Sequence, residues 1–133
     1  MKRDIILFLE DMLENIKKIE NSTKNLKKED FDKSPDIQDA TIRRIEVIGE
    51  SVKNIPEDFR QKYPDVEWRK IAGSRDVIIH QYFGINLERI WKVVKDELPE
   101  LEENINEILD KERKEQKTKE KNIVLKQKVN DKS

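Results

Sequence analysis

The sequence predicts an all-α protein, an up-and-down bundle of four to five helices that forms a single domain. Charged residues make up 43 % of the 133 positions and apolar residues 35 %, with only three glycines and four prolines. This composition is typical of long amphipathic helices and disfavours a sandwich or a barrel. The length is that of one domain with one hydrophobic core. Because the chain has no cysteine, disulfides, thiolate catalysis and cysteine-ligated metal sites are excluded.

The first two long helices follow from apolar residues that recur every three or four positions. In the first, from Lys2 to about Asn21, these residues are Ile5, Phe8, Leu9, Met12, Ile16 and Ile19. In the second, from the turn at Ser34 to about Asn54, they are Ile37, Thr41, Ile45, Ile48 and Val52. Gly49 lies inside the second helix, where glycine costs about 1 kcal/mol relative to alanine. Either another backbone approaches closely at Gly49, or the helix simply tolerates the glycine.

Two further helices complete the bundle. A third is expected over residues 66–83, ending at Gly84, and a fourth begins with Asn86 as its cap. The fourth carries an apolar stripe as far as Ile108, with a bend or a restart at Pro99. The stripes are wide and aromatic residues crowd the later helices, so one copy leaves apolar surface that a second copy would bury. We therefore expect a homodimer.

Charge divides the chain into two parts. Residues 111–133 hold nine basic and four acidic side chains, a net charge of +5, so residues 1–110 carry −6. We expect residues 1–110 to form the helical domain, and residues 111–133 to be a basic tail, a frayed helix extension followed by disorder. The sequence has neither the apolar core of a signal peptide nor a membrane span. A cytoplasmic protein without membrane partners is therefore expected.

One segment concentrates side chains that can carry chemistry. Arg75, Asp76, His80 and Tyr82 place a permanent cation, a carboxylate, the only imidazole of the chain and a phenol within eight residues. On one continuous helix, Asp76 and His80 would share a face, and Arg75 and Tyr82 would share another. Arg75 and His80 would stand about 140° apart, too far apart to bind one phosphate easily. The alternative reading is a histidine that is structural or exposed and a partly buried tyrosine.

This segment resembles the HEPN superfamily, and within it the HepT-type ribonuclease toxins, whose hallmark is Arg, four residues, His, one residue and Tyr. Here the hallmark is Arg75, His80 and Tyr82. The likeness extends to three further blocks, at residues 40–50, 63–73 and 96–101. It covers about residues 1–110 and leaves the basic tail outside.

The resemblance implies a HEPN-like homodimer that cleaves RNA without a metal or another cofactor, at a site built across the dimer interface. Carried over by position, Arg75 and His80 are the catalytic pair and Asp76 is a supporting residue. The HepT-type proteins are similar in being paired with a small MNT-type nucleotidyltransferase antitoxin, which neutralises them and can transfer AMP to the motif tyrosine. That makes Tyr82 the candidate AMPylation site, and a larger complex with the antitoxin is an open alternative to a plain dimer.

The chemistry of RNA cleavage agrees with a dimeric site. Attack by the 2′-hydroxyl needs a base, an acid for the leaving 5′-oxygen and a cation for the phosphorane. One histidine per chain cannot serve as both acid and base in a concerted step, whereas two chains supply two. The expected products are a 2′,3′-cyclic phosphate and a 5′-hydroxyl. The RNA target, with tRNA as one candidate, is not encoded in so short a motif.

Basic residues outside the motif are candidates for phosphate or interface contacts. They are Arg43, Arg44, Arg69 and Lys70. The acidic domain disfavours avid RNA binding, although a local basic cleft doubled by a dimer would suffice. The basic tail is either a solvated, solubilising segment or a loose electrostatic tether for RNA.

Three other readings compete with the ribonuclease. A noncatalytic HEPN-like helical dimer would use the same pocket to bind a nucleotide or a partner protein. A simple interaction bundle fits the apolar stripes but leaves the Arg75 to Tyr82 motif unexplained. A metalloenzyme is disfavoured, because a single histidine lacks the other ligands that helical metal sites bring.

Overall fold

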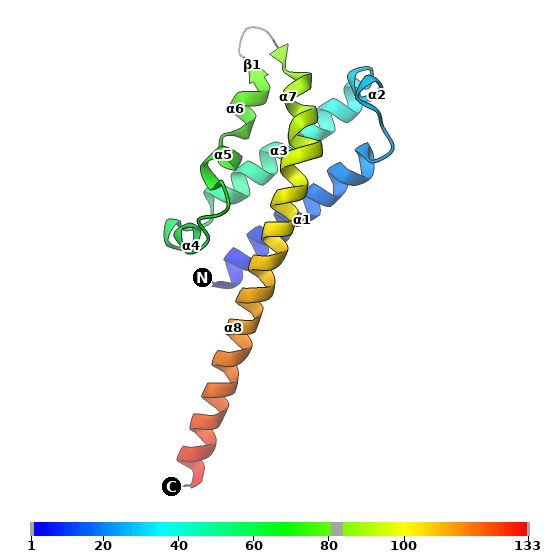
Figure 1. The fold of residues 1–133 in the computed structure, drawn as a ribbon. Helices are drawn as coiled ribbons and strands as arrows, with labels where there is room; N and C mark the ends of the chain where they lie inside the picture. Colours follow the sequence, from blue (N-terminus) through cyan, green and yellow to red (C-terminus); the bar gives the residue numbers. More distant parts are fainter. Residues whose placement is uncertain (1, 81–83, 133) are drawn as a thin grey trace.

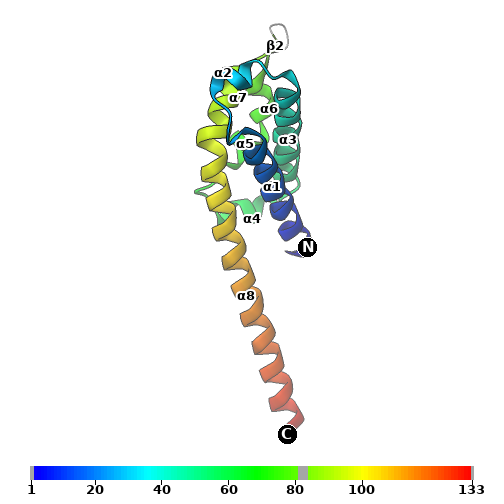
Figure 2. The same ribbon diagram turned by 90° about the vertical axis from the view of Figure 1, so that its right-hand side faces the viewer.

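The computed structural model describes residues 2–80 and 84–132 and confirms the all-α fold class (Figure 1). In chain order, the elements are α1 (Lys2–Thr23), α2 (Lys28–Asp32), α3 (Pro35–Lys53), α4 (Glu57–Lys62), α5 (Trp68–Ala72), α6 (Ser74–Ile78), β1 (Ile79–His80), β2 (Gly84–Ile85), α7 (Leu87–Lys92), the π-helix η1 (Val93–Glu97) and α8 (Leu98–Lys132). Three long rods form the bundle: α1, α3 and the continuous α7, η1 and α8 (Figures 1 and 2). The short helices α4 to α6 pack along one side of these rods (Figure 1).

The core lies where the apolar stripes of the three rods meet. Its buried members include Leu9, Met12, Ile16 and Ile19 of α1, Ile45, Ile48 and Val52 of α3, and Leu98, Leu101, Ile105 and Ile108 of α8. Each such side chain contributes roughly 1.5–3 kcal/mol when it leaves water. Within residues 2–80 and 84–132, no helix has an apolar stretch long enough to cross a bilayer.

Gly49 marks a close contact between α3 and α5. A Cβ atom added at this position would lie 3.2 Å from the carbonyl oxygen of Ile71 and 3.3 Å from that of Ala72. Backbone atoms cannot swing away as a flexible side chain can. The close approach of another backbone, one of the two readings of this glycine, is therefore confirmed.

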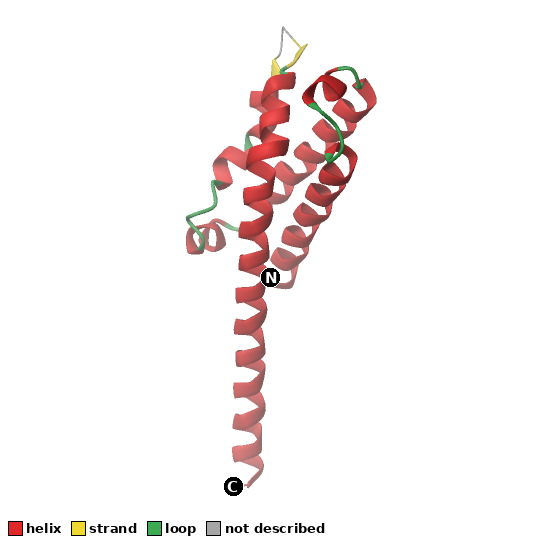
Figure 3. Cartoon of the chain, turned by 45° about the vertical axis from the view of Figure 1, so that its right-hand side comes forward, coloured by secondary structure: helices red, strands yellow, loops and turns green. Residues whose placement is uncertain are grey.

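The expected single helix over residues 66–83 is wrong. The chain instead forms α5 and α6, which ends at Ile78, and then the antiparallel ribbon of β1 and β2, the yellow strands in Figure 3. Ile79, the first residue of β1, is β-branched, which favours extended backbone. Gly84 does not stop a helix but begins β2, with φ at +81°, a conformation that glycine adopts at little cost. Residues 81–83 lie outside the described residues.

The fourth expected helix is present and starts where predicted. The side chain of Asn86 caps α7 by accepting a hydrogen bond from the amide of Arg89 at 3.1 Å. After α7 comes the wide π-helical turn η1, which ends two residues before Pro99. Pro99 explains this turn, because proline has no amide hydrogen to donate to the carbonyl four residues back. In η1 the amide of Leu98 bonds to the carbonyl of Val93, five residues back.

Residues 111–133, expected as a frayed extension and disorder, continue α8 as far as Lys132. The first turn of this segment is held by α4, because Glu112 is only 2 % exposed and accepts hydrogen bonds from Lys62, at 2.8 Å, and from the Tyr63 hydroxyl. Burial, reinforced by Glu112, raises the pKa of Tyr63, so the hydroxyl keeps its proton and continues to donate. Beyond Glu115 the helix projects past the bundle (Figures 1 and 2).

Candidate active site

Arg75, Asp76 and His80 lie at one end of the bundle, where the chain changes from helix to strand (Figure 1). Arg75 and Asp76 belong to α6, Asp76 being exposed, and His80 is the second residue of β1. The continuous helix from which a face shared by Asp76 and His80 was predicted is absent, because α6 ends at Ile78 and His80 belongs to β1. Tyr82, the predicted AMPylation site, lies outside the described residues. The structure thus places Arg75 and His80 on two consecutive elements joined without a loop.

Both elements are fixed by contacts to the bundle. Ile78 is 1 % exposed, and its carbonyl oxygen accepts the amide of Asn86 at 2.8 Å. In the ribbon, His80 pairs with Gly84. At the other end of α6, the Ser74 hydroxyl donates to the carbonyl of Ile71 at 2.8 Å. Asn86 caps α7 with its side chain and donates its backbone amide to Ile78, the last residue of α6. The backbone around the motif is therefore bonded to the first turn of the long rod.

A hollow opens beside α6, between α3, α5, η1 and α8. Ser74, the residue before Arg75, is part of its wall. The apolar part of the wall is formed by Ile45, Ile48, Val66, Ile71, Val93, Leu98 and Leu101. Charged side chains, among them Lys70, Arg89 and Glu97, line the rest. The hollow therefore combines an apolar lining with ionised groups.

Glu97 joins two cations at this hollow. Its Oε1 atom lies 2.8 Å from Nζ of Lys70 and 3.0 Å from a guanidinium nitrogen of Arg89. The hydrogen bond with Glu97, with help from Glu67 at 3.3 Å, raises the pKa of Lys70. Lys70, a predicted phosphate or interface contact, is thus engaged by two carboxylates. Sequence reasoning missed Arg89 and Glu97.

The π-helical turn is what brings Arg89 and Glu97 together. Residues eight apart on an ideal α-helix stand about 80° apart around the axis. One extra residue in a π-helical turn makes that spacing equivalent to about seven residues, which puts both side chains on one stripe. Pro99 was the only signal in the sequence that pointed toward this irregularity.

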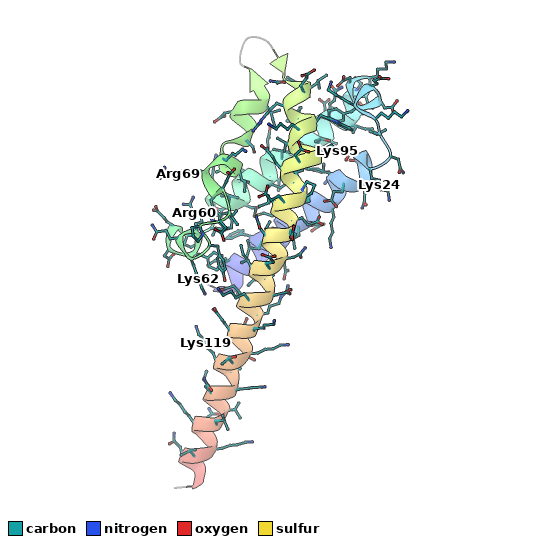
Figure 4. The ribbon with its side chains drawn as sticks, in the orientation of Figure 1. Lys24, Arg60, Lys62, Arg69, Lys95 and Lys119 are labelled. Atoms are coloured by element: carbon teal, nitrogen blue, oxygen red, sulfur yellow. The ribbon has the colours of Figure 1, made fainter. Side chains whose placement is uncertain are left out.

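The other predicted basic contacts are more open. Arg43 is exposed and pairs loosely with Glu46 at 3.7 Å, and Arg44 is half-buried. Arg69 is exposed on α5 and shares a shallow surface with Lys70 and with Arg60 of α4. Arg60 and Arg69 lie on the same side of the molecule (Figure 4). Arg60 is a further cation that sequence reasoning did not single out.

The chemistry available to the motif segment follows from its residue types. A guanidinium binds a phosphate through paired hydrogen bonds, and an imidazole exchanges protons near neutral pH. Among the side chains that the structure describes, no three carboxylates or imidazoles gather as a group that could hold a metal ion.

Comparison with known proteins extends this picture beyond the motif. The family described as "Ribonuclease HepT-like" matches residues 12–108. A Thermococcus cleftensis protein named "Probable ribonuclease HepT" is 45 % identical over 76 % of this chain and 92 % of its own length. A Methanocaldococcus jannaschii protein named "Putative RNase" is 48 % identical over 81 % of this chain and 89 % of its own.

A longer protein of the same archaeon, named "Gamma-glutamylcyclotransferase and putative RNase", is 44 % identical over 83 % of this chain, which spans 50 % of that protein. No solved structure matches the chain. The family match covers the second half of α1, the whole of α3, the start of α8 and the segment that carries Arg75 and His80. The chain therefore belongs to the HepT-like family of the HEPN superfamily.

Proposed function

We propose that this protein is an endoribonuclease that needs no metal and cleaves RNA through attack by the 2′-hydroxyl group. The observation that carries the proposal is the Arg75, His80 and Tyr82 spacing inside a chain that belongs to the HepT-like family. The anchored junction of α6 and β1 supports it, because catalytic groups act best on backbone that does not move.

In this proposal Arg75 binds the scissile phosphate and stabilises the charge that develops on the phosphorane. His80 transfers the protons, and Asp76 supports it. Since each chain has one histidine, the His80 of a second copy supplies the missing acid or base, and the active species is a homodimer. The products are a 2′,3′-cyclic phosphate and a 5′-hydroxyl.

Regulation of the same site completes the proposal. The protein acts as the toxin of a toxin-antitoxin pair and is neutralised by an MNT-type nucleotidyltransferase. In the modification step, the Tyr82 oxygen attacks the α-phosphorus of ATP, pyrophosphate leaves, and the tyrosine carries AMP. In this proposal, the added phosphodiester and purine keep an RNA phosphate from binding Arg75, by charge and by bulk.

RNA cleavage in excess EDTA tests the catalytic part. Wild type is expected to cleave, and Arg75→Ala and His80→Ala are expected to lose at least about 100-fold in rate, the usual scale for a lost acid, base or charge stabiliser. Arg3→Ala, a change in an exposed residue of α1, is the matched control and is expected to keep full activity. Circular dichroism checks that each variant is folded.

Failure of wild type to cleave, while its measured mass confirms that Tyr82 is unmodified, would favour a noncatalytic HEPN-like dimer that binds a nucleotide or a partner protein. Cleavage that survives both substitutions would place the active site elsewhere.

Intact-mass measurement tests the modification. After incubation with the nucleotidyltransferase and ATP, wild type is expected to gain the mass of AMP and Tyr82→Phe to gain nothing. An equal gain by both proteins, or none by wild type, would remove Tyr82 from the proposal.

A further inference from the structure

The end of α8 is a helical arm that stands clear of the bundle. All residues from 116 to 130 are exposed, and this segment, which we call the arm, extends beyond every other element (Figures 1 and 2). The arm contains five lysines and a single acidic residue, Glu120. The acidic domain therefore carries an exposed cationic helix.

Ion pairs at its base fix the direction of the arm. Glu112 is buried against Lys62, and Glu115 lies 2.8 Å from the same Nζ atom. On the α1 side, Arg113 pairs with Glu10 at 2.9 Å. The turn of α8 just before the arm is thus held on two sides by ion pairs. The arm continues this anchored turn and is therefore not a loose tether.

Four lysines of α8 form one row, which we call the lysine stripe. Its members are Lys114, Lys117, Lys121 and Lys128. At 100° per residue, these side chains fall within a sector of about 60°, and the row is about 21 Å long. Between Lys114 and Lys128, no acidic residue falls within this sector, and Asp110 lies one turn before its first lysine. Lys119 and Lys126 lie on the opposite face.

The stripe is unneutralised and carries an energetic cost. Within the part of the chain that the structure describes, none of its four lysines makes an ion pair. Like charges at i and i+4, as at Lys117 and Lys121, destabilise a helix by about 0.2–0.5 kcal/mol per pair. Neighbouring charges also lie within about one Debye length of roughly 10 Å at 0.1 M salt. A linear polyanion would relieve this repulsion.

The exposed apolar residues of the arm do not favour a protein partner. Ile123, Val124, Leu125 and Val129 are 48–67 % exposed. Ile123, Val124 and Leu125 are consecutive and therefore point in three directions about 100° apart, so they form no seam for a second helix. The continuous feature of the arm is its charge.

We propose that the lysine stripe binds the phosphate backbone of single-stranded RNA. The inference rests on the proposed function, since it assigns to the RNA substrate a second contact away from the motif. The start of α7, beside the ribbon that carries His80, is about 50 Å from Lys121 along the helix axis. An RNA bound at the stripe must therefore be long if it is also to reach the motif of the same chain. The stripe raises the affinity for long RNA and takes no part in the cleavage reaction.

Two double substitutions with the same charge change test the stripe. They are K117Q/K121Q, on the stripe, and K119Q/K126Q, on the opposite face. Glutamine keeps helix propensity, and circular dichroism verifies that the arm is unchanged. The probe is a fluorescent RNA of about 40 nucleotides with 2′-O-methyl groups, which cannot be cleaved by 2′-hydroxyl attack, titrated by anisotropy over a range of NaCl concentrations.

For wild type, the logarithm of the binding constant is expected to fall linearly with the logarithm of salt concentration. K117Q/K121Q is expected to make this slope shallower by about 1.4, two contacts at about 0.7 each for single strands. K119Q/K126Q is expected to keep the wild-type slope. Equal slopes for the two variants would overturn the inference. An anionic membrane is the other surface that a row of lysines could bind, and phosphatidylserine vesicles test it. If K117Q/K121Q lost binding to these vesicles but bound RNA as wild type does, the inference would also be overturned.

Cleavage of natural RNA separates this inference from the proposed function. If K117Q/K121Q raises KM for long RNA and leaves kcat unchanged, both stand. If wild type binds the 2′-O-methyl RNA through the stripe but cleaves no natural RNA, the function fails and the inference stands. If wild type cleaves and K117Q/K121Q matches it in KM and in salt slope, the inference fails and the function stands.

Discussion

Gly84 is the residue at which backbone conformation decides the shape of the motif. Its φ of +81° lies in the left-handed region, and nothing lies within 4 Å of a Cβ atom added there. Gly84→Ala is therefore expected to cost about 1–2 kcal/mol of unfolding free energy from strain alone, measured by urea denaturation. Gly84→Asn is expected to cost less, because asparagine tolerates this conformation.

Gly73→Ala is the matched control for Gly84. Its added Cβ atom would meet only the Arg69 carbonyl oxygen, at 3.5 Å, an ordinary contact, and its φ is −96°. A loss at Gly73 as large as that at Gly84 would show that strain is not the cause.

Glu20 and Glu102 form a carboxyl pair between α1 and α8. Burial, followed by the hydrogen bond and the repulsion from Glu102, raises the pKa of Glu20, and one oxygen of Glu102 is buried without a partner. Because the pKa of Glu20 is higher in the folded state than in the unfolded state, the protonated carboxyl contributes to the free energy of unfolding. This contribution is fully present below the ordinary pKa of glutamate and is lost as the pH rises through the raised pKa.

Glu20→Gln removes this pH-dependent loss. The variant is expected to unfold about 2 °C above wild type at pH 7, and the difference is expected to vanish near pH 4, where the wild-type carboxyl is protonated. Thermal unfolding at both pH values measures it, with Glu103→Gln, an exposed position one residue from Glu102, as control. A gain that persists at pH 4 would contradict the assignment.

At the scale of elements, the wide turn η1 matters because it aligns Arg89 with Glu97. Glu97→Gln weakens the bonds to Lys70 and Arg89 and is expected to lower the unfolding free energy by about 1 kcal/mol, the scale of a partly buried ion pair. Denaturant titration measures the change. Glu100→Gln alters an exposed carboxylate of the same hollow and is expected to leave stability within about 0.5 kcal/mol of wild type.

The helices were predictable from sequence where periodicity alone decides the structure. The stripes of α1 and α3 appear as expected, and the close backbone contact at Gly49 is one of the two readings that the sequence allowed. The break at Ile78 was not predictable, because the apolar residues of the ribbon repeat at spacings that also fit a helix.

The candidate site was predictable in its chemistry but not in its surroundings. The residue types of Arg75, Asp76 and His80 stand out in the sequence because they fall within one short segment. The bonds from Glu97 to Lys70 and Arg89 depend on helix packing and on one irregular turn, and neither leaves a periodic signal in the sequence.

At the scale of the whole molecule, the proposed catalytic homodimer makes activity depend on protein concentration. Specific activity is expected to fall on dilution, in step with dissociation of the dimer, because a single chain offers one His80. Cleavage assays and sedimentation equilibrium over the same dilution series measure the two curves. Constant specific activity in samples that sediment at the 15.9 kDa of one chain would contradict a shared active site.

The length of α8 has a consequence for hydrodynamics. A compact chain of 133 residues has a radius of gyration of about 14 Å, whereas a 35-residue helix is about 52 Å long. A molecule with such a rod diffuses more slowly than a sphere of its mass, so a monomer leaves a gel-filtration column early, at the volume of a larger globular protein. Elution volume therefore overstates the number of subunits, and only a shape-independent mass, from light scattering or native mass spectrometry, counts them.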